Sequence, residues 1–87
     1  MSVRDILLQF RWNPAYKIEQ SNISISFENR GSFNDIATCQ YSQITRIGKK
    51  FFWIIIEGES QETPIPFHRV LRIYNNFSHH KFYSKSN

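Results

Sequence analysis

Phe51 to Ile56 is the longest uninterrupted apolar run in this chain of 87 residues. It is too short for a membrane helix, which needs about 20 apolar residues, but it suits a strand that is buried on both faces. A chain of this size buries only about 60–65% of the surface that its unfolded form exposes, so it has room for one small core. We therefore expect a single domain, residues 1–87, with this run as its central strand and with residues 1–4 and 84–87 frayed.

The composition favours sheet over helix. The chain has 12 Ile, 2 Val and 3 Thr against 3 Leu and 2 Ala, the residues that fill helices best. Ile23, Ile25 and Phe27 alternate with polar residues, which predicts a strand with one buried and one solvated face. A turn around Gly31 follows, and a second short strand is expected near Phe33 to Thr38.

Two later segments form an imperfect repeat. Residues 41–47 and 67–73 share an aromatic residue, then a β-branched residue, then Arg-Ile. We interpret each copy as a tight helical turn that leads into a hairpin. The first hairpin runs from Thr45 to Glu57 and the second from Leu71 to Tyr83. Between them, the polar segment Gly58 to Thr63 is expected to be an exposed loop.

The N-terminal segment has the pattern of a short amphipathic helix. Ser2 and Asp5 fit a capping box, and apolar residues then recur at helical spacing. Pro14 has no N–H to donate, so the helix should end near Trp12. The expected fold class is therefore α+β, with an N-terminal helix packed on a small, mostly antiparallel, curved sheet of about five or six strands.

Charge and cysteine content narrow the function classes. The chain has 11 Lys plus Arg against 7 Asp plus Glu, a formal net charge of +4, and it has 8 Phe, 4 Tyr and 2 Trp. Modest positive charge with surplus aromatic surface favours a nucleic acid as the partner.

The single cysteine, Cys39, cannot form an intramolecular disulfide, which indicates a reducing compartment. The N-terminus lacks the apolar core of a secretory signal, so we expect a cytoplasmic protein without a membrane segment.

The string Ile65-Pro66-Phe67-His68-Arg69-Val70 holds the strongest candidate for a binding site. Its apolar residues can anchor a rigid turn, so that His68 and Arg69 point outward. An arginine offers a planar fork of donors that matches phosphate oxygens, and a histidine adds one or two N–H donors. In the alternative, which the residues alone favour slightly, Arg69 pairs with Glu57 or Glu59 and His68 only caps a carbonyl.

Four other side chains are weaker candidates. Arg30 lies in a turn beside Gly31, where it is free to reach an anion. Lys49 and Lys50 at a hairpin tip would extend a track of phosphate contacts, and Trp12 is chemically suited to stack on a base. Each has a plainer alternative, namely a solvated arginine, a solubilising lysine pair, and an aromatic that locks the helix onto the sheet. We favour that last role for Trp12.

The sequence gives little support for metal binding or catalysis. His79 and His80 are adjacent and would point to opposite faces of a strand, so they do not readily chelate one ion, and Cys39 has no visible partner. No phosphate-cradling glycine loop or nucleophile elbow is present. We expect no metal and no cofactor. An acid–base pair of His68 with His79 or His80 stays open as the alternative of a weak RNA phosphodiesterase.

Three motifs together resemble a known family. Trp12-Asn13-Pro14 follows the short helix, Asn29-Arg30-Gly31 follows the alternating strand, and the Ile65 to Val70 string precedes the closing hairpin. In this order, over about Asp5 to Tyr83, the chain resembles the small archaeal family of uncharacterised proteins known as the RNA cyclic group end recognition domain.

The resemblance implies a binding module rather than an enzyme. Related domains occur alone or joined to RNA-processing domains such as phosphoesterases and nucleotidyltransferases, which is why recognition of RNA ends with a cyclic phosphate was proposed for them. Carried over by position, the resemblance makes Arg30, His68 and Arg69 the phosphate-contacting set, with RNA and an RNA-processing enzyme as partners. The chain departs from the family at Asn29, where Asp is usual, and at Phe82-Tyr83, where a Trp-containing strand is frequent.

Two other functions stay open beside RNA-end binding. Surplus aromatic residues could form a patch for another protein, which would make the chain a protein-interaction domain. The weak histidine-dependent phosphodiesterase is the second. RNA-end binding depends on whether Arg30 lies near His68 and Arg69 in the folded chain, because one terminal phosphate cannot contact residues that lie far apart.

Overall fold

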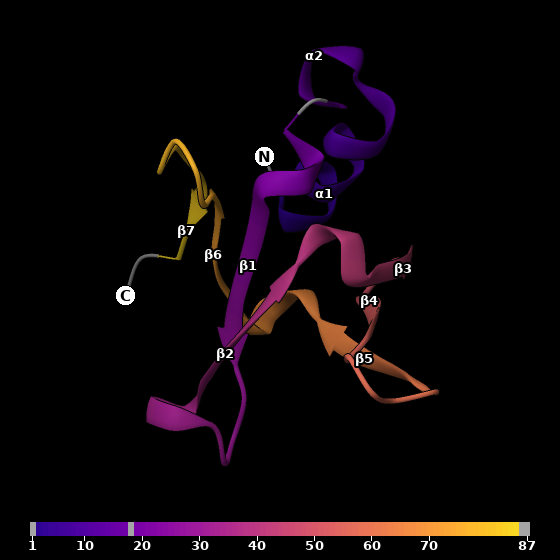
Figure 1. Ribbon diagram of the computed structural model, residues 1–87, viewed down its shortest axis with the longest axis vertical. Helices are drawn as coiled ribbons and strands as arrows, with labels where there is room; N and C mark the ends of the chain where they lie inside the picture. Colours follow the sequence, from indigo (N-terminus) through magenta and orange to yellow (C-terminus); the bar gives the residue numbers. More distant parts are fainter. Residues whose placement is uncertain (1, 18, 86–87) are drawn as a thin grey trace.

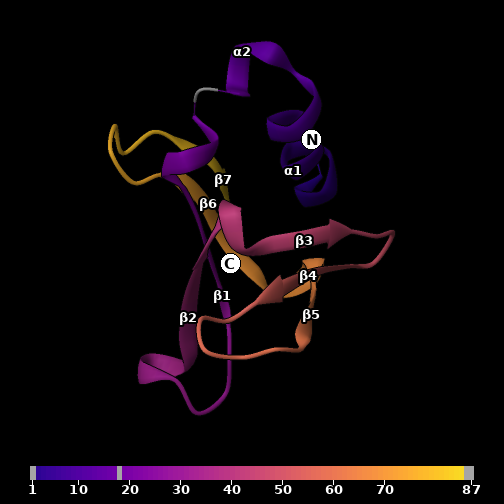
Figure 2. The same ribbon diagram turned by 45° about the vertical axis from the view of Figure 1, so that its right-hand side comes forward.

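The computed structural model describes residues 2–17 and 19–85, which fold into two antiparallel sheets and a helical N-terminal segment (Figures 1 and 2). The elements are α1 (Val3–Trp12), α2 (Pro14–Lys17), β1 (Ile23–Glu28), β2 (Ile36–Gln40), β3 (Ile44–Ile47), β4 (Phe51–Ile55), β5 (Glu62–Pro66), β6 (Val70–Asn75) and β7 (Lys81–Ser84). Short 3₁₀ turns lie between them: η1 (Gln20–Asn22), η2 (Phe33–Asp35), η3 (Tyr41–Gln43) and η4 (Phe67–Arg69). None of the helices in these residues has the length and apolarity that crossing a membrane requires.

The strands are divided between two sheets. The four-stranded sheet has the order β2-β1-β6-β7, and the three-stranded sheet has the order β3-β4-β5. The α+β class with an N-terminal helix and antiparallel strands is confirmed. The single curved sheet of five or six strands is not confirmed, because the chain leaves one sheet through η3 and returns to it through η4.

Helix α1 forms as its sequence predicts. The Asp5 N–H donates to Ser2 Oγ at 3.1 Å and the Ser2 N–H donates to the Asp5 carboxylate at 3.4 Å, which completes the capping box. The helix ends at Trp12, two residues before Pro14. Its apolar stripe faces the core and consists of Val3, Ile6, Leu7 and Phe10.

Strand β4 is the middle strand of its sheet, as the apolar run predicts, but only one of its faces is fully buried. Phe52 and Ile54 belong to the core, with exposed fractions of 0% and 2%. On the other face Phe51 and Ile55 are exposed, as is Ile56 just beyond the strand. The three-stranded sheet therefore covers the core with one face and shows the other to solvent.

Strand β1 corrects the prediction of a solvated face. Ser24 and Ser26 are only 2% and 1% exposed, because β1 lies between β2 and β6 and is covered on both sides. The Ser24 hydroxyl donates to Gln40 Oε1, and the Ser26 hydroxyl shares a hydrogen bond with Thr38, both at 3.1 Å. Since these hydroxyls are paired, their burial carries little penalty.

The two hairpins and the tight helical turns before them are confirmed. Turn η3 leads into the β3–β4 hairpin, and η4 leads into the β6–β7 hairpin. Two boundaries differ from the prediction. The second short strand is Ile36–Gln40, with a 3₁₀ turn at Phe33–Asp35, and the expected loop Gly58 to Thr63 ends early because β5 begins at Glu62.

One hydrophobic core joins α1 to both sheets. Tyr41 lies at this junction, where its hydroxyl donates to the Leu7 carbonyl oxygen at 2.8 Å and its ring packs edge-on against Phe10. Burial raises the pKa of the Tyr41 phenol, because the phenolate would lose its water.

The fraying of residues 1–4 and 84–87 stays a prediction, and Met1, Ser86 and Asn87 lie outside the described residues.

Candidate functional site

The antiparallel pairing of β1 with β6 brings Arg30 and Arg69 to the same end of a sheet. In this pairing Phe27 lies opposite Val70. Arg30 follows Phe27 by three residues and Arg69 directly precedes Val70, so both leave the sheet at one edge. The register shifts at this point and leaves Leu71 as a bulge residue, an irregularity that is common where strands re-aim side chains next to functional sites.

The loop that carries Arg30 is held by its own hydrogen bonds. The Asn29 N–H donates to the Asp35 carbonyl oxygen, and Asn29 Nδ2 donates to Ser32 Oγ, both at 2.7 Å. Gly31 adopts a φ of 91°, which glycine reaches without strain. Its N–H donates to Asp35 Oδ1 at 3.4 Å. Arg30 therefore extends from a backbone whose course is fixed.

Turn η4, which carries Arg69, is anchored on both sides. The Phe67 ring stacks on Phe52, with ring centroids 5.9 Å apart and an interplanar angle of 18°. Val70 is fully buried at the start of β6. His68 and Arg69 lie between these anchors and are exposed, as the sequence predicts.

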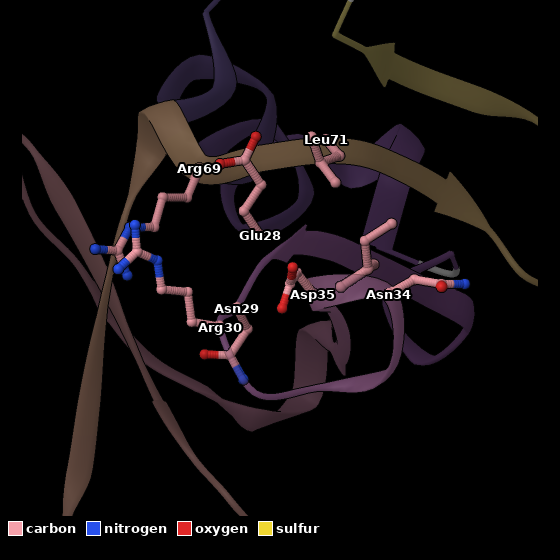
Figure 3. Close-up of a pocket in the computed structure, with 8 residues that line it drawn as sticks. Glu28, Asn29, Arg30, Asn34, Asp35, Arg69 and Leu71 are labelled. Carbon is pink, nitrogen blue, oxygen red and sulfur yellow. The ribbon is translucent and has the colours of Figure 1, made fainter.

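Arg30 and Arg69 line one solvent-open cavity of about 770 Å³, which we call the arginine cavity. Its other lining residues are Glu28, Asn29, Asn34, Asp35, Ile36 and Leu71. Figure 3 shows the side chains of Arg30 and Arg69 pointing toward one another. Two like charges that converge repel each other, so an anion bound between them relieves the repulsion and accepts hydrogen bonds from both.

Neither guanidinium of the cavity has an ionic partner among residues 2–17 and 19–85. Within those residues the ion pair that is present joins Arg46 to Glu62. The alternative in which Arg69 pairs with Glu57 or Glu59 is therefore not found in the described part of the chain. Both cavity arginines keep their donors available for a ligand.

His68 is next to Arg69 on η4 but is not among the residues that line the arginine cavity. Its side chain is exposed, and its carbonyl oxygen accepts a hydrogen bond from Lys85 Nζ at 2.7 Å. The structure thus brings Arg30 and Arg69 into one cavity and leaves His68 outside its lining.

Lys49 and Lys50 are exposed at the β3–β4 turn. The Phe67 N–H donates to the Lys50 carbonyl oxygen at 3.1 Å, which places this turn beside η4. The lysines are therefore neighbours of the turn that carries Arg69, on the side of Phe67.

Trp12 does not lock the helix onto the sheet, so the favoured prediction for this residue is wrong. Its side chain is 75% exposed at the C-terminal end of α1. In both ribbon views, α1 and the β1–β2 loop lie at opposite ends of the molecule (Figures 1 and 2). Trp12 is free to meet a partner, but it is remote from Arg30.

Phe33 is a candidate that the sequence analysis missed. Its side chain is 88% exposed, and it directly precedes Asn34, which lines the arginine cavity. A phenylalanine this exposed contributes nothing to the core. An aromatic residue in the same loop as a candidate phosphate ligand was the signal that could have found it.

The structure places His68 at the opposite end of β6 from His79 and His80. His68 precedes β6, whereas His79 and His80 follow it, in the turn before β7. Strand β6 has six residues. At ~3.4 Å per residue its two ends lie about 17 Å apart. That separation is too long for one acid–base pair to act on a single bond.

Metal and thiol chemistry gain no support from the side-chain positions. Residues 2–17 and 19–85 contain no group of three or more His, Cys, Asp or Glu side chains that could hold a metal ion. Cys39 is buried, and burial raises the pKa of its thiol to about 12. A thiol with this pKa stays protonated near neutral pH, so it is neither a nucleophile nor a ready metal ligand.

A family model described as the MJ1316 RNA cyclic group end recognition domain matches residues 1–85. No curated protein and no solved structure gives a significant match. The match covers nearly the whole chain, including both loops that supply the arginine cavity, so the resemblance seen in the three motifs is confirmed.

Proposed function

This chain belongs to the family of the RNA cyclic group end recognition domain, and from that premise we propose that it binds RNA ends by holding a terminal cyclic phosphate between Arg30 and Arg69. RNA binding in general follows from the family. The observation that supports the finer proposal is the convergence of two guanidinium groups in one cavity, without an ionic partner in the described part of the chain.

The chemistry of the ligand fits this pair. A terminal cyclic phosphodiester carries one negative charge on two free oxygens, and each guanidinium presents a planar fork of N–H donors. A hydrogen bond to a charged group contributes about 1.5–3 kcal/mol. Two arginines therefore support specific binding of moderate strength, without the surplus of positive charge that a phosphomonoester would favour.

His68, Lys49 and Lys50 have secondary roles in the proposal. His68 is exposed next to Arg69 and has N–H donors that suit a phosphate oxygen at the margin of the cavity. The β3–β4 turn lies beside η4, which supports a role for its lysines in contacting phosphates further along the RNA.

We assign stacking of the terminal base to Phe33 rather than to Trp12. Sequence-specific and end-specific RNA binding uses aromatic side chains on which splayed bases stack. Phe33 is exposed in the loop that also carries Arg30, whereas Trp12 lies at the other end of the molecule. A nucleotide whose phosphate reaches the cavity therefore has its base near this loop.

The separation of the histidines supports a binding module rather than a histidine-dependent phosphodiesterase, because no histidine lines the arginine cavity in the described residues. In this proposal the protein marks RNA ends for processing or repair, and the chemistry belongs to a partner enzyme.

The test compares one short oligonucleotide with a cyclic phosphate end and with a plain hydroxyl end, in a fluorescence titration at fixed salt. We expect the cyclic phosphate end to bind at least ~100-fold more tightly, since two charge-assisted contacts are lost with the phosphate. Equal affinities for the two ends would contradict end recognition, and ring opening during the incubation would support an enzyme instead.

A further inference from the structure

We propose that Glu28 and Asp35 are specificity residues, which make the arginine cavity accept a singly charged phosphodiester end and reject a doubly charged phosphomonoester. This inference rests on the proposed function, because it concerns the same cavity. It assigns a role to the two carboxylates that share the cavity with Arg30 and Arg69.

Both carboxylates belong to elements that border the cavity. Glu28 is the last residue of β1 and Asp35 the last residue of η2, and both are exposed. In the described part of the chain neither forms an ion pair with Arg30 or Arg69. Figure 3 shows the arginine side chains pointing toward each other, while the two carboxylates point elsewhere. The carboxylates are therefore not counter-ions that neutralise the arginines by contact.

The formal charges of the cavity lining cancel. Two guanidinium groups and two carboxylates give a sum of zero, counted over the lining residues. A ligand with one charge can still place it between the arginines. An open phosphomonoester carries a total charge of about −1.5 to −2 near pH 7. Its charge beyond the first is attracted by the arginines but repelled by both carboxylates.

Desolvation adds to this discrimination. The cost of taking an ion out of water rises with the square of its charge, whereas its attraction to a fixed set of charges rises only linearly. A cavity with no surplus positive charge does not offset the larger cost of the phosphomonoester. The phosphodiester is favoured in the same cavity, since its single charge has a smaller desolvation cost.

The backbone of Asp35 makes a clean substitution available. Asp35 has a φ of 56°, and its Oδ1 accepts the Gly31 N–H. Asparagine tolerates this left-handed conformation and keeps the Oδ1 acceptor, so Asp35→Asn removes the charge without removing the loop's hydrogen bond. Glu28→Gln does the same at an exposed strand end.

The experiment uses the full chain and one oligonucleotide with three phosphorylated ends. These are a cyclic phosphate, an open monophosphate, and an open phosphate capped by a methyl group, which carries the same single charge as the ring. The variants are Glu28→Gln and Asp35→Asn, separately and together. Glu59→Gln is the matched control, because it removes one exposed carboxylate that does not line the cavity.

For the unsubstituted protein we expect the cyclic and the methyl-capped ends to bind alike and the monophosphate end more weakly. Each cavity variant should improve binding of the monophosphate relative to the cyclic end by about 3- to 10-fold. Glu59→Gln should change this ratio by no more than about twofold, since it removes an exposed, solvent-screened charge that does not line the cavity.

Two outcomes would overturn the inference alone. Either the cavity variants leave the ratio unchanged, or the methyl-capped end binds as weakly as the monophosphate, which would make ring shape the criterion. Failure of the proposed function is visible separately, as equal binding of cyclic phosphate and hydroxyl ends by the unsubstituted protein, and it would overturn this inference as well.

Discussion

Arg46 on β3 and the two arginines of the cavity lie in very different surroundings. Arg46 Nε donates to Glu62 Oε2 at 3.1 Å, and its guanidinium carbon lies 4.0 Å from the ring centroid of Trp53. Arg30 and Arg69 have neither an ion pair nor an aromatic partner in the described part of the chain. All three side chains are exposed, so exposure alone does not distinguish them.

In our proposal, the difference separates arginines that serve the fold from arginines that are available to a ligand. The contacts of Arg46 on β3 reach Trp53 on β4 and Glu62 on β5, so they join the three strands of one sheet and lie within the protein itself. Arg4 is similar, since its Nε donates to the Gly48 carbonyl oxygen at 2.9 Å. The donors of Arg30 and Arg69 converge on open space instead. Substitutions at the two places should therefore separate stability from binding.

The largest effect is expected from Arg30→Ala and Arg69→Ala. Each should weaken binding of a cyclic-phosphate RNA end by ~10- to 100-fold, because one charge-assisted contact of about 1.5–3 kcal/mol is lost. The free energy of unfolding should change by less than about 0.5 kcal/mol, since exposed side chains without partners add little. Titration and urea denaturation measure the two quantities. A large loss of stability with unchanged binding would reverse the comparison.

A smaller effect is expected from Phe33→Ala. Loss of base stacking should weaken binding of the same RNA about 5-fold or more, while the free energy of unfolding stays unchanged, because the ring is 88% exposed. Trp12→Ala provides the control, as a second exposed aromatic that is remote from the cavity. If Trp12→Ala weakened binding more than Phe33→Ala, the terminal base would lie on the wrong side of the molecule for our proposal.

Arg46→Ala sharpens the comparison from the other side. Its ion pair and its position over Trp53 together should stabilise the fold by about 1 kcal/mol, which denaturation would reveal as a loss. RNA affinity should stay within about twofold, because Arg46 does not line the cavity and its guanidinium is paired with Glu62. An affinity loss equal to that of Arg69→Ala would mean that net charge, rather than the cavity, decides binding.

The smallest effect concerns salt. Each phosphate contact on a single strand contributes a slope of about −0.7 to the logarithmic plot of affinity against salt concentration. Arg30→Ala should reduce the magnitude of that slope by about this amount. Arg46→Ala should leave the slope unchanged, and titrations at several salt concentrations would decide between the two results.

The sequence predicts those parts of the fold that depend on neighbouring residues. The cap formed by Ser2 and Asp5, the stop at Pro14 and the two 3₁₀ turns are local, and all are found. The division into two sheets depends on contacts between distant strands. Ser24 shows the limit of periodicity, because a serine that faces solvent and one that is buried in a hydrogen bond have the same alternation pattern.

The candidate site was likewise predictable only where it depends on neighbouring residues. Pro66 and Val70 bracket η4 locally, so the outward direction of Arg69 could be predicted. That Arg30 shares its cavity follows from the β1–β6 register, which composition and spacing do not reveal. The acidic part of the lining and the exposure of Phe33 were missed for the same reason, since both depend on how the β1–β2 loop closes.

The central claim is that Arg30 and Arg69 hold the same phosphate, and a double-mutant cycle tests it most directly. Affinity for the cyclic-phosphate end would be measured for the unsubstituted protein, Arg30→Ala, Arg69→Ala and the double variant. If both guanidinium groups hold one phosphate, removal of either also weakens the contact that the other makes, so the double variant should be weakened by clearly less than the product of the two single effects. If the affinity loss of the double variant equals the product of the two single losses, the two contacts are independent, which would contradict the shared site.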